Sequence, residues 1–235
     1  MPASRAPRKS HQPRGLIILH EDRDIVVVDK APGLLTVATA NERRETAYYR
    51  LNDYVRHGNP KSRERIFIVH RLDREVSGIL VFARSEAAKR ALQGQWDQVE
   101  KRYLALVQGE PRAPEGVFSS YLIEEGVHRV RSTPNAARGK LSHTAYRLLA
   151  SRNGVSLLEI SLMTGRKHQI RVHLAENGLP ILGDRKYGVA KYGEKRVALH
   201  ARSLDFRHPY SGEPRHYETP QPPFVARYLD GASGR

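Results

Sequence analysis

The chain has 235 residues, of which 39% are hydrophobic and 28% charged, a composition typical of a soluble globular protein. Forty lysine and arginine residues against 25 acidic ones give a net charge of +15, which favours a polyanionic partner because cations that neutralise phosphates release condensed counterions. Without cysteine, the chain forms no disulfide, thiolate nucleophile or cysteine-based zinc site. No apolar run reaches the roughly 18 residues of a membrane span, and the N-terminus lacks the apolar core of a secretory signal. We therefore expect a cytoplasmic protein with no membrane association.

Composition also predicts how the chain is organised. Residues 1–15 hold four basic residues, three prolines and no acid, which predicts a disordered basic arm. Residues 16–230 show no linker and no internal repeat, and we expect them to form one domain. Residues 231–235, with the sequence GASGR, are expected to be a loose C-terminal tail.

The first half of the chain contains short apolar runs separated by turns. GLIILH and DIVVVDK lie on either side of a polar turn and predict a β-hairpin that starts at Leu16. A helix is predicted around 46–55, strands at 66–69 and 78–83, and a further strand at 103–107. Between the last two, Ser85 is a predicted N-cap for a helix to about Glu100, in which apolar residues recur every three or four positions.

The second half is richer in strand patterns. Strands are predicted at 143–149, 155–163 and 198–206, and a tight turn at 208–212 leads into a last one. A short helix is predicted from about His168, ended by Asn177 and Gly178. Because strands outnumber helices and do not alternate regularly with them, we expect an α+β fold with a mostly antiparallel, mixed central sheet flanked by helices and loops.

The strongest local pattern is a polar loop, His70 to Gly78, between two apolar strand-like runs. Polar loops that are held by buried strands are typical places for catalytic groups. The alternative is an exposed turn with a salt bridge. The chain has no GxGxxG after a strand, no phosphate-binding GxxxxGK[ST] loop, no GxSxG and no HExxH, so neither a nucleotide cofactor nor a serine acyl transfer is indicated.

A second polar cluster extends from Thr164 to His173. Arg166, Lys167 and Arg171 lie at the start of the predicted helix, where basic side chains and exposed N–H groups could gather phosphates. His168 and His173 are five residues apart and do not share a helix face as zinc-binding pairs do. We expect no metal site here, and hydrogen-bonded structural histidines instead.

These blocks resemble the RluA-type family of RNA pseudouridine synthases, over about Leu16 to Phe224. Five blocks carry the resemblance in the family's order, and they are His70-Arg71-Leu72-Asp73 with Ser77-Gly78, Lys101 to Val107, Thr164 to His173, Gly183 to Gly188, and Leu199-His200-Ala201 with His208-Pro209. Val76 stands where the family usually has threonine, and Lys30-Ala31-Pro32-Gly33 shifts the usual proline. Many relatives carry an N-terminal S4-type RNA-binding domain, whereas here the catalytic-type sequence begins almost at once, so we expect target choice to rest on this domain and its basic arm.

The resemblance implies the fold and the reaction. It implies a pseudouridine synthase-like catalytic domain with a central RNA-binding cleft, in which selected uridines of structured RNA are isomerised to pseudouridine. Uracil is detached from C1′ of the ribose, rotated and rejoined through C5, so no atom is gained or lost. No cofactor or metal is therefore expected. Ribosomal RNA and tRNA are both open as targets, and a monomer is slightly favoured over a dimer.

The resemblance assigns three catalytic residues. Asp73 would be the nucleophile, and its attack on C1′, its attack on C6 and its removal of a ribose proton all stay open. Arg171 would pair with Asp73 and hold the carboxylate ionised. Tyr103 would pack against the uracil and is the candidate for removing the C5 proton, although a tyrosine with its usual pKa near 10 is a poor base at neutral pH. Without its flanking block, Tyr103 would be taken for a core aromatic residue.

The remaining candidates bind substrate. A uridine must leave its stack to reach Asp73, and Arg71 would fill the vacated space and bind phosphate or base. Arg166, Lys167 and His168 are weaker candidates for phosphate contacts.

Two other functions compete with this hypothesis. A metal-dependent nuclease could use Asp73, His70, His168 and His173, but it would need a compact cluster of ligands that the spacing does not indicate. A non-catalytic RNA-binding or assembly factor could retain the fold, although the presence of all three candidate catalytic residues argues against it.

Overall fold

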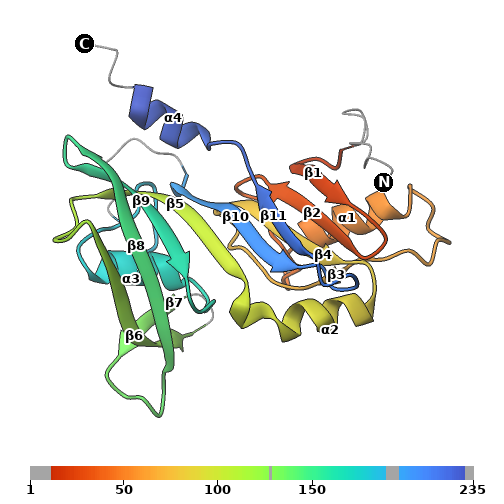
Figure 1. Ribbon diagram of the computed structural model, residues 1–235, viewed down its shortest axis with the longest axis horizontal. Coiled ribbons are helices and arrows are strands. Elements are labelled where there is room, and N and C mark those ends of the chain that lie inside the picture. The colour runs from red at the N-terminus through yellow and green to blue at the C-terminus, as the bar shows by residue number, and fades with distance from the viewer. Residues whose placement is uncertain (1–11, 127–128, 189–195, 231–235) are drawn as a thin grey trace. The chain divides into compact units, whose positions relative to one another are not determined.

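The computed structural model describes residues 12–126, 129–188 and 196–230 (Figure 1). The chain divides into two compact units, one formed by residues up to Val99 together with Leu204–Thr219, the other by Glu100–Ser203 with the residues from Pro220 onward. Most of the predicted basic arm and the predicted C-terminal tail lie outside the described residues. The described chain starts at Gln12, whose side chain accepts a hydrogen bond from the N–H of Ile18, so hydrogen-bonded structure begins four residues before the predicted start at Leu16.

The first unit is an open sheet with helices. Its elements are β1 (Leu16–Glu21), β2 (Ile25–Lys30), α1 (Ala47–Val55), β3 (Phe67–Ile68), β4 (Ser77–Ala83), α2 (Glu86–Gly94), the 3₁₀ turn η2 (Trp96–Gln98) and β11 (Pro214–Glu218), with the second half of β10 (Leu199–Arg207). The strand order is β1-β2-β4-β10, with β3 beside β4 and β11 beside β10. Strands β1, β2 and β4 pair antiparallel, which confirms the predicted hairpin.

The core of this unit lies on β2 and β4. Consecutive side chains of these strands are fully buried, so both faces of this part of the sheet are covered. Helix α2 packs against β3 and β4 through Ala88 and Leu92, and Val99 joins the same core, as the periodicity predicts. Ser85 caps α2 by accepting from the N–H of Ala88. The predicted end of this helix at Glu100 is wrong, because the α-helix stops at Gly94, a poor helix former, and continues as a 3₁₀ turn.

The second unit is a mostly antiparallel sheet with helices, in which strands distant in sequence also pair. Its elements are the first half of β10 with β5 (Glu100–Gln108), β6 (Glu115–Glu125), β7 (Arg129–Thr133), β8 (Lys140–Arg152), β9 (Val155–Leu162), α3 (Gln169–Glu176) and α4 (Pro223–Asp230). The strand order is β10-β5-β9-β8-β6-β7, and the pairs from β5 to β7 are antiparallel. The α+β prediction is confirmed, whereas β6, β7 and α4 were not predicted. Among the described residues, no helix is both long and apolar enough to cross a membrane.

Helix α3 is almost completely buried although it is rich in polar residues. It packs against β6, β7 and β8, and six of its eight residues are buried, among them Gln169, Arg171 and His173. The two ring nitrogens of His173 bond the hydroxyls of Ser120 and Thr144, at 3.0 and 2.9 Å. Burial lowers the pKa of His173 and so favours its neutral form. The polar residues of α3 are therefore accommodated by specific hydrogen bonds.

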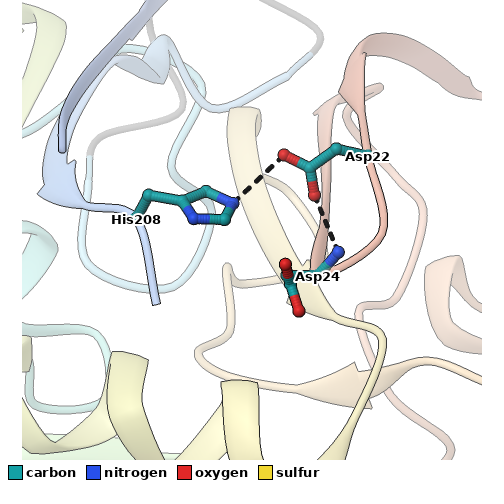
Figure 2. A group of neighbouring side chains, drawn as sticks. All are labelled: Asp22, Asp24 and His208. Atoms are coloured by element: carbon teal, nitrogen blue, oxygen red, sulfur yellow. Dashed lines mark hydrogen bonds and ion pairs between the residues drawn. The ribbon is translucent and has the colours of Figure 1, made fainter. Parts of the chain in front are cut away.

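Asp22 joins two distant turns of the first unit (Figure 2). It lies between β1 and β2, and its Oδ1 accepts the N–H groups of Asp24 and Ile25 at 2.8 and 2.9 Å. Its Oδ2 is bonded to Nε2 of His20 at 2.8 Å and to Nε2 of His208 at 3.1 Å. His208 precedes β11, and its Nδ1 accepts from the backbone at Ser211, which leaves the proton on Nε2 to be donated to Asp22.

Asp22, Asp24 and His208 also form a group whose ligand atoms lie within 4.8 Å of one another, a spacing that a metal ion could bridge. Both oxygens of Asp22 already accept two hydrogen bonds each. An ion would have to displace these bonds, so we interpret the group as a structural connection between turns. Burial raises the pKa of Asp22, but the bonds from His20 and from the two backbone N–H groups outweigh it and hold the pKa well below its usual range.

Replacing Asp22 by asparagine should destabilise the fold by about 1.5–3 kcal/mol near neutral pH, because hydrogen bonds to a charged acceptor are lost. Since the pKa of Asp22 is lower in the folded than in the unfolded chain, its contribution is complete above about pH 4 and declines as the pH falls further. The difference in unfolding free energy between parent and Asp22→Asn, measured by urea titration, should therefore shrink in acid. Asp24→Asn is the matched control, expected to change stability by less than about 0.5 kcal/mol. Equal losses for both variants would contradict this role of Asp22.

Candidate active site

The loop that carries Asp73 connects β3 to β4 in the first unit. Leu72 and Val76 are buried, Arg71 is exposed, and Asp73 is half-buried. The N–H of Val76 donates to the carbonyl of Asp73 at 3.2 Å and closes a turn directly after it. This bond uses the backbone, so the turn does not depend on the threonine hydroxyl that the resemblance leads one to expect at position 76.

His70 anchors the start of this loop to the sheet. Its Nε2 accepts a hydrogen bond from the N–H of Val81 on β4 at 3.1 Å, and its ring packs on Trp96 with 4.5 Å between centroids. A ring nitrogen that accepts from a backbone N–H carries no proton. His70 is thus a structural histidine of the loop, with one nitrogen already in use.

A buried lysine lies beneath the same loop. The Lys30 side chain is fully buried, and its Nζ donates to the carbonyls of Leu34 at 2.9 Å, Ala31 at 3.0 Å and Arg74 at 3.4 Å. Burial lowers the pKa of Lys30 to about 8, and the negative charges of Asp73, Glu75 and Asp29 oppose that shift. A cation therefore lies within the electrostatic reach of Asp73 in its own unit, at a position to which the sequence analysis assigned no role.

Tyr103 and Arg171 both belong to the second unit. Tyr103 lies on β5, opposite Ile160 on β9, and is 9% exposed. Arg171 lies on α3 and is buried with Asp184: its Nε donates to Oδ2 at 2.7 Å and its Nη2 to Oδ1 at 2.9 Å. This two-bond geometry fixes the plane of the guanidinium group.

Asp184 also orders the segment that follows it. Its Oδ1 accepts the backbone N–H groups of Lys186 at 3.0 Å and Tyr187 at 3.2 Å. Burial alone would raise the pKa of Asp184. The hydrogen bonds and charge of Arg171 and the two backbone N–H bonds have the larger effect and lower the pKa, so the carboxylate stays ionised. The Tyr187 ring lies 5.4 Å from the Arg171 guanidinium carbon, a cation–π contact. Sequence reasoning missed Asp184, although the acid was visible inside one of the five blocks.

The predicted phosphate-binding residues have different surroundings. Arg166 is exposed. The Nζ of Lys167 donates to Glu124 at 2.9 Å, and Nδ1 of His168 bonds the hydroxyl of Tyr187 at 2.8 Å. His168 also has a φ of 54°, in the left-handed region, where it precedes α3. Arg166 is therefore the most accessible of the three, and His168 contributes to the same structural network as Arg171.

The histidines proposed for the rival nuclease are engaged elsewhere. His70 accepts from β4, His168 bonds Tyr187, and both nitrogens of His173 bond hydroxyl groups. Within the part of the chain that the structure describes, the one group with metal-binding spacing is that of Asp22, which contains none of them. The arrangement gives the nuclease hypothesis no support.

Comparison with known proteins decides the family. A family model described as RNA pseudouridylate synthase matches residues 24–176. The chain belongs to the RNA pseudouridylate synthase family. It is therefore an isomerase that acts on RNA, as the resemblance predicted.

Other members of the pseudouridylate synthase family match most of the chain. It is 36% identical to the dual-specificity RNA pseudouridine synthase RluA of Yersinia pestis, over 86% of this chain and 98% of that protein. It is also 36% identical to the ribosomal large subunit pseudouridine synthase D of Nitrosomonas europaea, over 94% of this chain and 67% of that protein. Among solved structures, human RNA pseudouridylate synthase domain containing 4 matches with a TM-score of 0.75 and 25% identity, over 90% of this chain and 91% of that chain.

The buried Arg171–Asp184 pair should be important for stability. Asp184→Asn removes the negative charge that the buried Arg171 guanidinium contacts at 2.7 and 2.9 Å, and we expect a loss of about 3–5 kcal/mol in unfolding free energy. The matched control is the surface pair of exposed Arg147 and half-buried Glu159, whose nitrogen and oxygen lie 2.8 Å apart, where Glu159→Gln should cost less than about 1 kcal/mol. Urea unfolding of both variants measures the difference. A similar small loss for both would show that the buried pair contributes no more than a surface one.

Proposed function

We propose that this protein converts selected uridines of ribosomal RNA or tRNA to pseudouridine, with Asp73 supplying the carboxylate that reacts with the nucleoside. Relatives named for large-subunit ribosomal RNA and relatives named as dual-specific are equally identical to this chain, so the proposal includes both RNA classes. The net charge of +15 suits a structured RNA partner. A cysteine-free chain suits a reducing compartment, and we propose a monomer that acts in the cytoplasm.

The observation that carries the proposal is the setting of Asp73. Its neighbours Leu72 and Val76 are buried, while Asp73 itself is half-buried on a loop between two strands of one sheet. A reactive group on a rigid scaffold with partial access to solvent can meet a nucleoside without a large rearrangement. The same segment resembles the family's catalytic signature and lies within the matched region, residues 24–176.

Two further residues complete the proposed chemistry. Tyr103, on a buried strand, would pack against the uracil and take part in removing the C5 proton. Arg171 would pair with Asp73 and hold it ionised. The bonds to Asp184 support this role because they fix the guanidinium plane, so a second carboxylate would meet an already oriented cation.

Access to the uridine requires flipping the base. Unstacking costs a few kcal/mol, and a cation that enters the vacated space recovers part of this cost. Arg71 is exposed and lies two residues before Asp73, which suits that role. Arg166, Lys167 and His168 would contact the RNA backbone, with the exposed Arg166 contributing most to affinity.

Asp73→Asn keeps the size of the side chain and removes its charge, so we expect turnover to vanish while RNA affinity changes only a few-fold. Conversion is measured by release of tritium from C5-labelled uridine in RNA, and affinity by filter binding. Asp97→Asn, at an exposed position of η2 in the same unit, is the matched control and should retain full turnover. An Asp73→Asn variant that still forms pseudouridine would remove the basis of the proposal.

Tyr103→Phe removes only the hydroxyl. If Tyr103 takes part in C5 deprotonation, we expect turnover to fall by about 10²–10⁴-fold, the usual contribution of a general base, with little change in affinity. Tyr146→Phe, on β8 of the same unit, is the control: its hydroxyl has one bond to a carbonyl, at 3.4 Å, and its ring stacks on Phe118. Equal turnover of Tyr103→Phe and parent would leave Tyr103 with a packing role alone.

A further inference from the structure

The segment from Lys30 to Thr36 lies against the loop that carries Asp73, and both belong to the first unit. It has no regular strand pairing with that loop. Side-chain and backbone groups from the segment bond the two residues on either side of Asp73 instead. The geometry of these bonds suggests a function that the family assignment does not supply.

On the N-terminal side of Asp73, one hydroxyl serves both backbone groups of Leu72. Thr36 Oγ1 donates to the Leu72 carbonyl at 2.8 Å and accepts from the Leu72 N–H at 3.2 Å. Thr36 is 2% exposed and Leu72 is 7% exposed, so water cannot easily replace these bonds. The Thr36 hydroxyl thus makes both hydrogen bonds with the Leu72 backbone that a neighbouring strand would otherwise make.

On the C-terminal side, the carbonyl of Arg74 is held from two directions. The N–H of Gly33 donates to it at 2.7 Å, and Nζ of Lys30 approaches it at 3.4 Å. In the opposite direction, the Nε of Arg74 donates a hydrogen bond to the Gly33 carbonyl at 3.1 Å. Gly33 has a φ of +89°, which residues with side chains rarely adopt, so the backbone conformation that makes these bonds depends on glycine there.

The segment is itself anchored. The N–H groups of Ala47 and Tyr48, in the first turn of α1, donate to the carbonyls of Leu35 and Thr36 at 2.7 and 3.1 Å. The segment therefore connects a helix to the loop, and a displacement of Thr36 would be transmitted to Leu72.

We propose that Thr36 is a positioning residue for the Asp73 carboxylate, acting through the backbone of Leu72, with Lys30 and Gly33 holding the other side through Arg74. This inference rests on the proposed function, in which Asp73 carries the chemistry. A carboxylate that must meet one carbon of a flipped nucleoside has a narrow range of productive positions, and a displacement of about 1 Å can cost 10²-fold in rate. Bonds on both neighbours restrict the Asp73 backbone without using the carboxylate itself.

The test is a series at position 36, measured with the same labelled RNA. Thr36→Val keeps the shape and removes the hydroxyl, and we expect kcat to fall by about 10–100-fold while RNA affinity stays within about threefold of the parent. Thr36→Ser restores the hydroxyl and should recover most of the turnover. A purely structural residue would not give this separation of kcat from affinity, nor recovery on restoring the hydroxyl alone.

Ser85→Ala controls for general loss of stability. Ser85 caps α2 by accepting from the N–H of Ala88 at 3.0 Å, so its loss destabilises the same unit by about 1 kcal/mol. We expect a lower melting temperature for Ser85→Ala with kcat unchanged. If it lowered kcat as much as Thr36→Val does, the positioning role would be overturned. If Thr36→Val does not fold at the assay temperature, Thr36→Cys, which keeps a weak donor, should give intermediate turnover, and full turnover in that variant would also overturn the proposal.

Asp73→Asn separates this inference from the proposed function. An inactive Asp73→Asn together with a fully active Thr36→Val would refute only the positioning role. An active Asp73→Asn would refute the proposed function and, with it, the reason for placing Asp73 accurately.

Discussion

Buried backbone groups outside helices and strands need hydrogen-bond partners, and this requirement determines the structure around Asp73. The loop between β3 and β4 has no strand beside it at Leu72 and Arg74. Thr36, Gly33 and Lys30 supply the missing partners with a hydroxyl, an N–H and an ammonium group. Leaving such a group unpaired costs about 1–3 kcal/mol, comparable to a large part of the net stability of a domain. The same bonds that satisfy the backbone therefore also limit where the loop can lie.

In the second unit, a buried charged side chain needs a partner in the same way. Helix α3 carries an arginine into a core from which water is excluded, and Asp184 neutralises it with two bonds. Asp184 in turn depends on the N–H groups of the turn that it precedes, and Tyr187 from that turn bonds both His168 and the backbone of Val130. Residues from two of the family's sequence blocks, Thr164 to His173 and Gly183 to Gly188, thus stabilise one another.

How much of this could be predicted from the sequence depended on the range of the interactions. Local patterns were sufficient for the β1–β2 hairpin, for α1, for the Ser85 cap of α2 and for the α+β class, because side-chain periodicity and capping are properties of adjacent residues. Strand β6 was missed because hydroxyl, glycine and acidic residues along it obscure the alternation. Helix α4 was missed although Pro223 at its first position is a known start signal. Asp73 was found through its motif, whereas Thr36 and Lys30 were not, since their partners lie 36 and 44 residues away in the chain.

The division of the chain has a consequence for the order of folding during synthesis. The second unit is nearly continuous in sequence, and its strands from β6 to β9 pair with near neighbours, so much of it can form as it emerges. The first unit ends at Val99 and resumes only at Leu204, with β11 and the second half of β10 still to be added. At 5–20 residues per second, a ribosome needs about 5–20 s to cover those roughly 105 residues. During that interval the edge of β4 that later receives β10 is paired only at its end, by the two residues of β3, and its remaining backbone groups are open to pairing with other chains.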